Sequence, residues 1–182
     1  MRTIRRGGPY YRVADPDWDE PLSGVHAQRT GGRWNPMAAY PVVYLNATMA
    51  TARLNARRLL REKTLVGMPF SFDDLEPAAL PCLVVTSVPD SDVVDCVTDD
   101  GLVDAGLPGT YPDDGSGGTV PWATCQPVGV SAHDAELAGV AARSAAPGAS
   151  IGDEELAWFT DHGGPLTATA GPEPFAIWFG DY

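Results

Sequence analysis

The stretch from Gly31 to Asn55 constrains the fold more than any other part of the chain. It begins with two glycines and an arginine, continues as an apolar run from Tyr40 to Leu45, and then becomes rich in Ala, Arg and Leu. The apolar run has the β-branched and aromatic content of a strand. Thr48 is a suitable N-cap for a helix over residues 49–62. A glycine corner followed by a strand and a helix predicts an α/β (α+β) chain with an anion pocket at the corner.

The rest of the chain predicts short elements joined by turns, because Gly and Pro contribute 20 and 17 of the 182 residues. We expect one compact domain over residues 1–182, with mixed β-sheets flanked by a few helices. Loops are expected at 15–20, 23–32 and 107–121, and a turn at 73–77. Strands are expected at 9–14, 40–45, 66–72, 81–88, 139–145, 155–160 and 173–182, and further helices at 99–105 and 122–137.

The charges are distributed unevenly along the chain. Residues 1–63 carry eleven of the twelve basic side chains and five acidic ones, whereas the remainder carries one basic and nineteen acidic side chains. The overall net charge of −12 argues against a nucleic-acid partner. Arg12, Arg29 and Arg33 lie beside aromatic residues and glycines, so they are the candidates for gripping a phosphate group. The arginines of the expected helix are interpreted as its solvated face: Arg53, Arg57, Arg58 and Arg61.

Several classes of protein are excluded by what the sequence lacks. No apolar run reaches the roughly 18 residues that suggest a membrane span, and the basic N-terminus has no apolar segment of a secretory signal. We therefore expect a cytoplasmic protein without membrane contact. Cys82, Cys96 and Cys125 match neither a zinc pattern nor a disulfide framework, so we expect free thiols and no metal site.

Two isolated polar side chains call for an interpretation. His26 is interpreted as a hydrogen-bonded loop residue. Asn55 shares a helix face with Ala52 and Leu59, which turns one amide toward the interior. A buried amide is costly unless it is hydrogen-bonded, so Asn55 is either satisfied structurally or lines a cavity.

The motifs around the glycine corner resemble those of the RES-domain family, the toxins of bacterial RES–Xre toxin–antitoxin modules. The resemblance covers residues 10–160, and GGRWNP followed by a P-x-x-Y-L strand is its most specific part. The matching pieces occur in the family's order: Tyr11-Arg-Val, Gly31-Gly-Arg-Trp-Asn-Pro36, Pro41-Val-Val-Tyr-Leu45, Trp122, Cys125-Gln-Pro-Val-Gly129, Gly139 to Ala145 and Leu156-Ala-Trp-Phe159.

This resemblance implies a fold akin to ADP-ribosyltransferases, with a cleft for NAD. The family's toxins degrade NAD by hydrolysis or by phosphorolysis, so NAD would be a substrate or ligand and no cofactor would be bound permanently. An Xre-type antitoxin partner is implied as well, and a homodimer is expected because family members often dimerise.

The resemblance also implies site residues. Arg12, Arg33 and Tyr44 stand at the family's two basic positions and its strand tyrosine. Asn55 stands where the family has a glutamate, and Ala123 stands where it has a serine, with Thr124 next to it as a further candidate contact. An asparagine can bond a ribose hydroxyl, but it cannot stabilise an oxocarbenium-like cation as a carboxylate does.

Three functions remain open from the sequence. The chain is a divergent enzyme that cleaves the N-glycosidic bond of NAD or a related ribosyl-phosphate nucleotide, with a carboxylate such as Asp113 or Asp114 replacing the lost one. Alternatively, it is a catalytically degenerate module that binds a nucleotide or a protein. In the third interpretation the fold is redirected to another phosphorylated substrate, for example in small-molecule biosynthesis.

Overall fold

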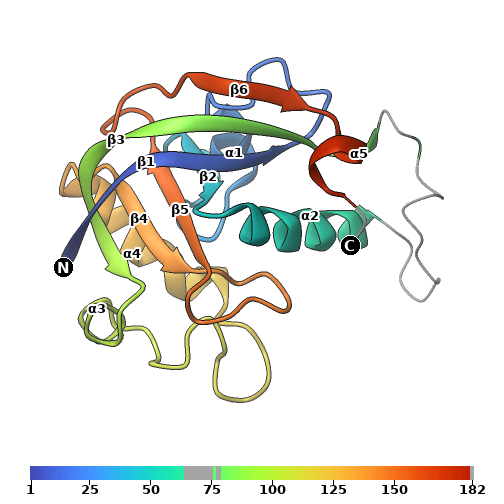
Figure 1. Ribbon diagram of the computed structural model, residues 1–182. Coiled ribbons are helices and arrows are strands. Elements are labelled where there is room, and N and C mark those ends of the chain that lie inside the picture. Colours follow the sequence, from blue (N-terminus) through green and yellow to red (C-terminus); the bar gives the residue numbers. More distant parts are fainter. Residues whose placement is uncertain (64–75, 77–78, 181–182) are drawn as a thin grey trace.

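The computed structural model describes residues 1–63, 76 and 79–180, in which six strands form one sheet and five helices surround it (Figure 1). The expected strand at 66–72 and nearly all of the expected turn at 73–77 lie outside the described residues. The strands are β1 (Thr3–Ala14), β2 (Val42–Asn46), β3 (Cys82–Cys96), β4 (Gly139–Arg143), β5 (Glu154–Phe159) and β6 (Ala168–Glu173). The helices are α1 (Val25–Thr30), α2 (Met49–Lys63), α3 (Asp99–Asp104), α4 (Trp122–Asp134) and α5 (Phe175–Trp178).

The sheet is mixed and curls back on itself. Its strand order is β1-β2-β5-β4-β3-β6, and β1 pairs additionally with β3. Figure 1 shows the long β3 curving away from β1 and β6 toward β4. The β3–β4 pairing is parallel and the other pairings are antiparallel. The α/β (α+β) class expected from the sequence is confirmed.

Most predicted elements are present, and two strands are longer than expected. β1 and β3 extend beyond the predicted 9–14 and 81–88 because they pair with each other from Thr3↔Val94 to Ala14↔Cys82. The sequence around Asp90 contains Pro, Asp and Ser, which are poor strand formers. Its pairing partner decides its conformation, and a register shift between Arg6 and Gly8 accommodates the irregularity.

Two predictions of local structure are wrong. The expected loop at 23–32 contains α1, because Gly24 and Gly31 mark its two ends with positive φ of 74° and 75° rather than interrupting it. In the described part of the expected strand at 173–182, only Glu173 belongs to a strand, at the end of β6, and Phe175–Trp178 form the helix α5. Phe175, Trp178 and Phe179 have the three- and four-residue spacing of a helix, and they pack together in one core cluster.

Helix α4 begins at Trp122 as expected and contains Pro127. Its buried side chains Cys125, Val128 and Ala132 belong to the core cluster that also holds Trp34. Gly129 allows the closest approach, since a Cβ atom there would lie 1.8 Å from the carbonyl oxygen of Trp34. α4 therefore packs directly against the backbone of the glycine corner.

The remaining expectations concern the cysteines and the membrane. Cys82, Cys96 and Cys125 are free thiols. Within the described part of the chain, no helix has the length and apolarity needed to span a bilayer.

The contact at Gly129 predicts the outcome of a substitution. Gly129→Ala should destabilise the protein by about 1–3 kcal/mol, although Ala is the better helix former, because the new methyl group pushes α4 away from Trp34. Urea unfolding measures the change. Gly152→Ala is the control, since it lies exposed with no atom within 4 Å of an added Cβ atom. Equal unfolding midpoints for the two variants would contradict the close contact.

Candidate functional site

The glycine corner is held by a buried hydrogen-bond network centred on Tyr44. The Tyr44 hydroxyl donates to Oδ1 of Asn35 at 2.8 Å and accepts from the backbone N–H of Trp34 at 2.9 Å. The Asn35 amide donates to the carbonyl of Ala27 in α1 at 2.8 Å. A Cβ atom at position 32 would lie 2.3 Å from the Tyr44 hydroxyl, so Gly32 is required for this packing. The G-G-R-W-N motif and the strand tyrosine thus form one structural unit.

A cavity of about 500 Å³ lies beside this unit. Four of the site residues expected from the sequence line it: Arg12, Arg33, Tyr44 and Asn55. Arg12 comes from β1, Arg33 from the corner, Tyr44 from β2 and Asn55 from α2. Arg12 and Asn55 are therefore far apart along the chain.

Arg12 is the buried cation of the pocket. Its Nη1 atom donates to the carbonyl of Tyr44 at 2.7 Å, and its guanidinium lies 5.0 Å from the ring centroid of Trp18. Its Nε atom is buried and has no hydrogen-bond partner among the described residues. Burial lowers the pKa of Arg12 to about 10, so the group is still charged at neutral pH. A buried cation with an unused donor is suited to an anionic ligand.

Arg12 forms no ion pair with a described carboxylate, although Asp15 and Glu155 line the same cavity. Tyr44 and Cys82 are the groups that act on it electrostatically. Burial raises the pKa of both the Tyr44 phenol and the Cys82 thiol, so both are neutral at pH 7.

Arg33 lines the same cavity at the corner. Its Nη1 atom donates to the carbonyl of Val120 at 2.7 Å, which connects the corner to the end of the 107–121 loop. The same nitrogen lies 3.8 Å from the Cys125 sulfur in α4. These bonds fix the direction of the guanidinium.

Asn55 is hydrogen-bonded and lines the cavity, so both interpretations of it from the sequence hold. Its Nδ2 atom donates to Oδ1 of Asn46 at 2.7 Å and to Oε1 of Glu155 at 2.9 Å. Ser144 donates to the same Glu155 oxygen at 2.5 Å. The other carboxylate oxygen, Oε2, has no hydrogen bond to any described residue. Glu155 lines the cavity, and it therefore brings a carboxylate directly beside the amide of Asn55.

Aromatic rings form one wall of the cavity. Trp18 and His26 both line it, with their ring centroids 4.4 Å apart and their planes tilted by 32°. Burial and the charge of Arg12 lower the pKa of His26, so this imidazole is neutral at pH 7. Trp122, the first residue of α4, contributes a third ring, which is exposed. Such rings are suited to stacking on a planar heterocycle.

Some residues singled out from the sequence lie elsewhere. None of the following described residues lines the cavity: Arg29, Asp113, Asp114, Ala123 and Thr124. All five are exposed. Asp114 instead accepts hydrogen bonds from Ser116 and Gly118 in its own loop.

The interpretation of the α2 arginines as a solvated face is wrong for the described ones. Arg53 donates to the carbonyl of Trp178 at 2.8 Å, and the Arg57 guanidinium lies 5.5 Å from the ring centroid of Phe179. Both arginines cover α5, which the sequence did not place against α2. Arg58 donates to Oδ1 of Asn55 at 3.3 Å and lines the cavity. The side chain of Arg61 lies outside the described residues.

Sequence reasoning missed Glu155, Trp18 and His26 as lining residues. Trp18 and His26 lie in segments read as loops, and no spacing rule brings them to Arg12. Glu155 begins a strand in which alternate residues face opposite sides, but only the pairing of Asn46 with Glu155 across β2 and β5 brings it to Asn55.

The comparisons with known proteins agree with the fold. The model of the RES domain family matches residues 9–176. The structure resembles that of MbcT in the crystal structure of the M. tuberculosis MbcT–MbcA toxin–antitoxin complex, with a TM-score of 0.69 and 26% sequence identity. The match covers 92% of this chain and 84% of the other. No curated protein matches the sequence. The family match covers nearly the whole chain, and the chain therefore belongs to the RES domain family.

Proposed function

We propose that this RES-domain protein binds NAD or a related ribosyl-phosphate nucleotide and cleaves its N-glycosidic bond, with Glu155 supplying the carboxylate. The observation that carries the proposal is that a buried guanidinium with an unused donor, Arg12, and a carboxylate, Glu155, line one cavity. Substrate and enzyme meet in the cytoplasm, where NAD is available. NAD is a substrate or ligand here, not a permanently bound cofactor.

The binding half of the proposal rests on the two arginines. A pyrophosphate would pair with the Arg12 guanidinium, and its Nε atom, which has no hydrogen-bond partner among the described residues, offers a donor toward it. Arg33, at the corner, holds a second guanidinium in the lining of the same cavity. Trp18 and His26 offer an aromatic wall for a base or for nicotinamide.

The catalytic half rests on Glu155. Departure of nicotinamide breaks the C–N bond, takes its electron pair and leaves positive charge on the ribose. A fixed carboxylate stabilises this charge, and Asn55 and Ser144 fix Glu155 by both donating to Oε1. That arrangement leaves Oε2 for the ribose. A water oxygen then forms the new C–O bond and releases a proton, which gives ADP-ribose, whereas inorganic phosphate gives ADP-ribose 1″-phosphate.

Glu155 thus replaces the glutamate that the family has at the position of Asn55. The two side chains are in contact at 2.9 Å, on α2 and β5. In this proposal the carboxylate of the site belongs to Glu155 on β5, and an amide occupies position 55 on α2. Asn55 acts as the positioning residue for Glu155.

The tyrosine and serine positions receive different roles in this proposal. Tyr44 supports the corner, because both hydrogen bonds of its hydroxyl are made to Trp34 and Asn35. Ala123 and Thr124 take no part, and Ser144 acts through Glu155.

An antitoxin is the proposed macromolecular partner. MbcT assembles with the antitoxin MbcA in the complex that this structure resembles. We propose an antitoxin partner for this chain on that basis, with the Xre type and a homodimer as the finer expectations.

A binding module without catalysis is the second candidate, favoured by the uncharged Asn55. Purified protein incubated with NAD, with and without phosphate, separates the two by nicotinamide release. Release supports the enzyme, and its dependence on phosphate distinguishes phosphorolysis from hydrolysis. NAD binding without release at high protein concentration would support the binding module. Neither binding nor release, together with a different co-purified phosphorylated ligand, would support a redirected substrate.

Glu155→Gln tests the carboxylate directly. We expect kcat for nicotinamide release to fall about 10²–10³-fold, with NAD affinity nearly unchanged, because Gln keeps the size and the acceptor oxygen but loses the charge. A discontinuous assay of nicotinamide release measures kcat, and isothermal titration calorimetry measures the affinity for NAD. Glu136→Gln, an exposed site beyond α4, is the matched control. Unaltered turnover in Glu155→Gln would contradict the role of Glu155.

Arg12→Ala tests the anion site. We expect NAD affinity to weaken about 10- to 100-fold, since a charge-assisted hydrogen bond is lost. The fold should persist, which far-UV circular dichroism and the melting temperature verify. Arg5→Ala is the control on the same strand, because the Arg5 side chain is exposed and pairs with Asp92. If Arg12→Ala unfolds the protein instead, Arg12 is structural and the pocket is misplaced.

A further inference from the structure

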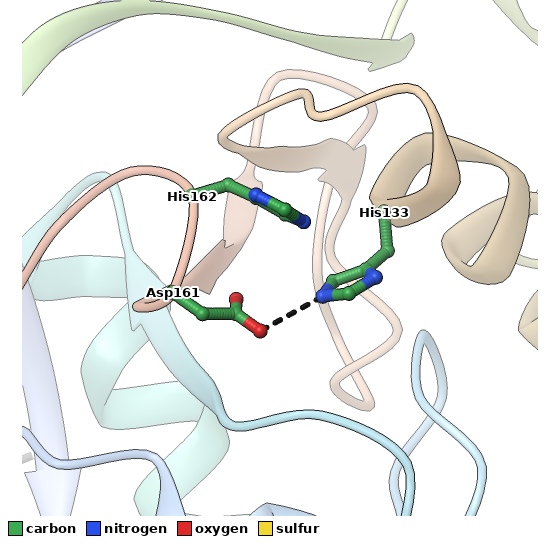
Figure 2. A group of neighbouring side chains, drawn as sticks. All are labelled: His133, Asp161 and His162. Atoms are coloured by element: carbon green, nitrogen blue, oxygen red, sulfur yellow. Dashed lines mark hydrogen bonds and ion pairs between the residues drawn. The ribbon is translucent and has the colours of Figure 1, made fainter.

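A second group of functional side chains lies away from the cavity, at the C-terminal end of α4. His133 from α4 and Asp161 and His162 from the turn after β5 point toward one another (Figure 2). Their ligand atoms all lie within 4.8 Å of one another, and Nε2 of His133 is 2.8 Å from Oδ2 of Asp161. Two of the three histidines of the chain meet here. None of the three side chains lines the cavity.

We propose that His133, Asp161 and His162 bind a divalent transition-metal ion, with Zn²⁺ as the ion that suits them best. Two imidazoles and one carboxylate are ligands that zinc accepts, and a set of three leaves a position for water. Imidazole also distinguishes zinc from Mg²⁺ and Ca²⁺, which prefer oxygen ligands.

The distances suit an ion after small side-chain rotations. Bonds of about 2.0–2.1 Å in a tetrahedral site place neighbouring ligand atoms about 3.4 Å apart. The distance between Nε2 of His133 and Oδ2 of Asp161 would increase slightly from 2.8 Å when an ion binds. A pair of ligand atoms as far apart as 4.8 Å would have to approach by little more than an ångström.

The ligand side chains are positioned by packed elements. The His133 ring stacks on the buried ring of Tyr40, with centroids 4.0 Å apart and an interplanar angle of 11°. The turn that carries Asp161 and His162 is held by the backbone N–H of Gly163, which donates to the carbonyl of Phe159 at 2.8 Å. This support limits the conformational entropy that the site loses when an ion binds.

The turn is fixed a second time through Trp158. The indole N–H of this fully buried side chain donates to the carbonyl of Gly164 at 2.9 Å. A Cβ atom at Gly163 would lie 2.3 Å from the same indole, so the turn lies directly on it.

The charge of this half of the chain also favours a cation. Residues 64–182 carry nineteen acidic side chains and one basic side chain, Arg143. Arg143 is engaged elsewhere, with the carbonyls of Val97 and Gly109. Asp134 and Asp161 both act electrostatically on Tyr40, so they surround the ring beneath His133 with negative charge.

Bound zinc would connect α4 to the turn after β5, two segments that β4 and β5 separate along the chain. Tyr40, the ring under His133, donates to the carbonyl of Trp34 in the glycine corner at 2.7 Å. The site therefore stabilises the elements behind the corner without contacting the cavity.

The test uses the full chain without a tag, after treatment with a chelator. Titration with ZnSO₄ in a calorimeter should give one equivalent bound, and MgCl₂ should give no binding. At a zinc concentration about a hundredfold above the dissociation constant, the melting temperature should rise by about 5–10 °C. No binding of Zn²⁺, or no change in the melting temperature, would overturn the proposal.

Three variants locate the ion. His162→Ala removes an exposed ligand and should lower zinc affinity at least about tenfold. His133→Phe should do the same while it keeps the ring that stacks on Tyr40. His26→Ala removes the remaining histidine and should leave zinc binding unchanged. Binding that is insensitive to His162→Ala and His133→Phe would show that the ion lies elsewhere, and that the cluster is only a hydrogen-bonded His133–Asp161 pair.

Discussion

The two hydrogen bonds of the Tyr44 hydroxyl hold together the part of the protein on which its site depends. One bond fixes the Asn35 side chain, which in turn bonds α1, and the other fixes the backbone of Trp34. The corner is then packed from behind by Gly129 of α4 and by the Tyr40 hydroxyl. A buried polar network of this kind is favourable only when each of its polar groups is hydrogen-bonded. The residues of the motif that take part in the network are therefore needed for the structure of the corner.

The site beside this corner contains a carboxylate and a guanidinium that differ in how far their hydrogen-bonding groups are used. Glu155 receives hydrogen bonds from Asn55 and Ser144, whereas Arg12 is buried with one donor unused. Burying a charge is costly unless it is paired, so a guanidinium that is buried with an unused donor retains the capacity to bind an anion. The pocket is accordingly better prepared for an anionic ligand than for a neutral one.

The reliability of the sequence predictions varied with the physical origin of the signal. The α2 helix and the strands β4 and β5 were placed correctly, because their hydrophobic pattern and caps are local. The α1 and α5 helices were missed because short helices depend on packing, and glycines or aromatic residues there suggested loop and strand. The length of β1 and β3 depends on their mutual pairing, which no local window contains.

The sequence by itself determined the family, through the corner motif and the order of the motifs that follow it in the chain. The family implied the α/β (α+β) class. It also implied that Arg12, Arg33, Tyr44 and Asn55 lie in one cavity. The tertiary structure alone decided where the carboxylate lies. Position 55 is an amide, and Glu155 is a hundred residues away along the chain. Only the antiparallel pairing of β2 with β5 places them in contact, because strand register is set by long-range pairing and not by local sequence.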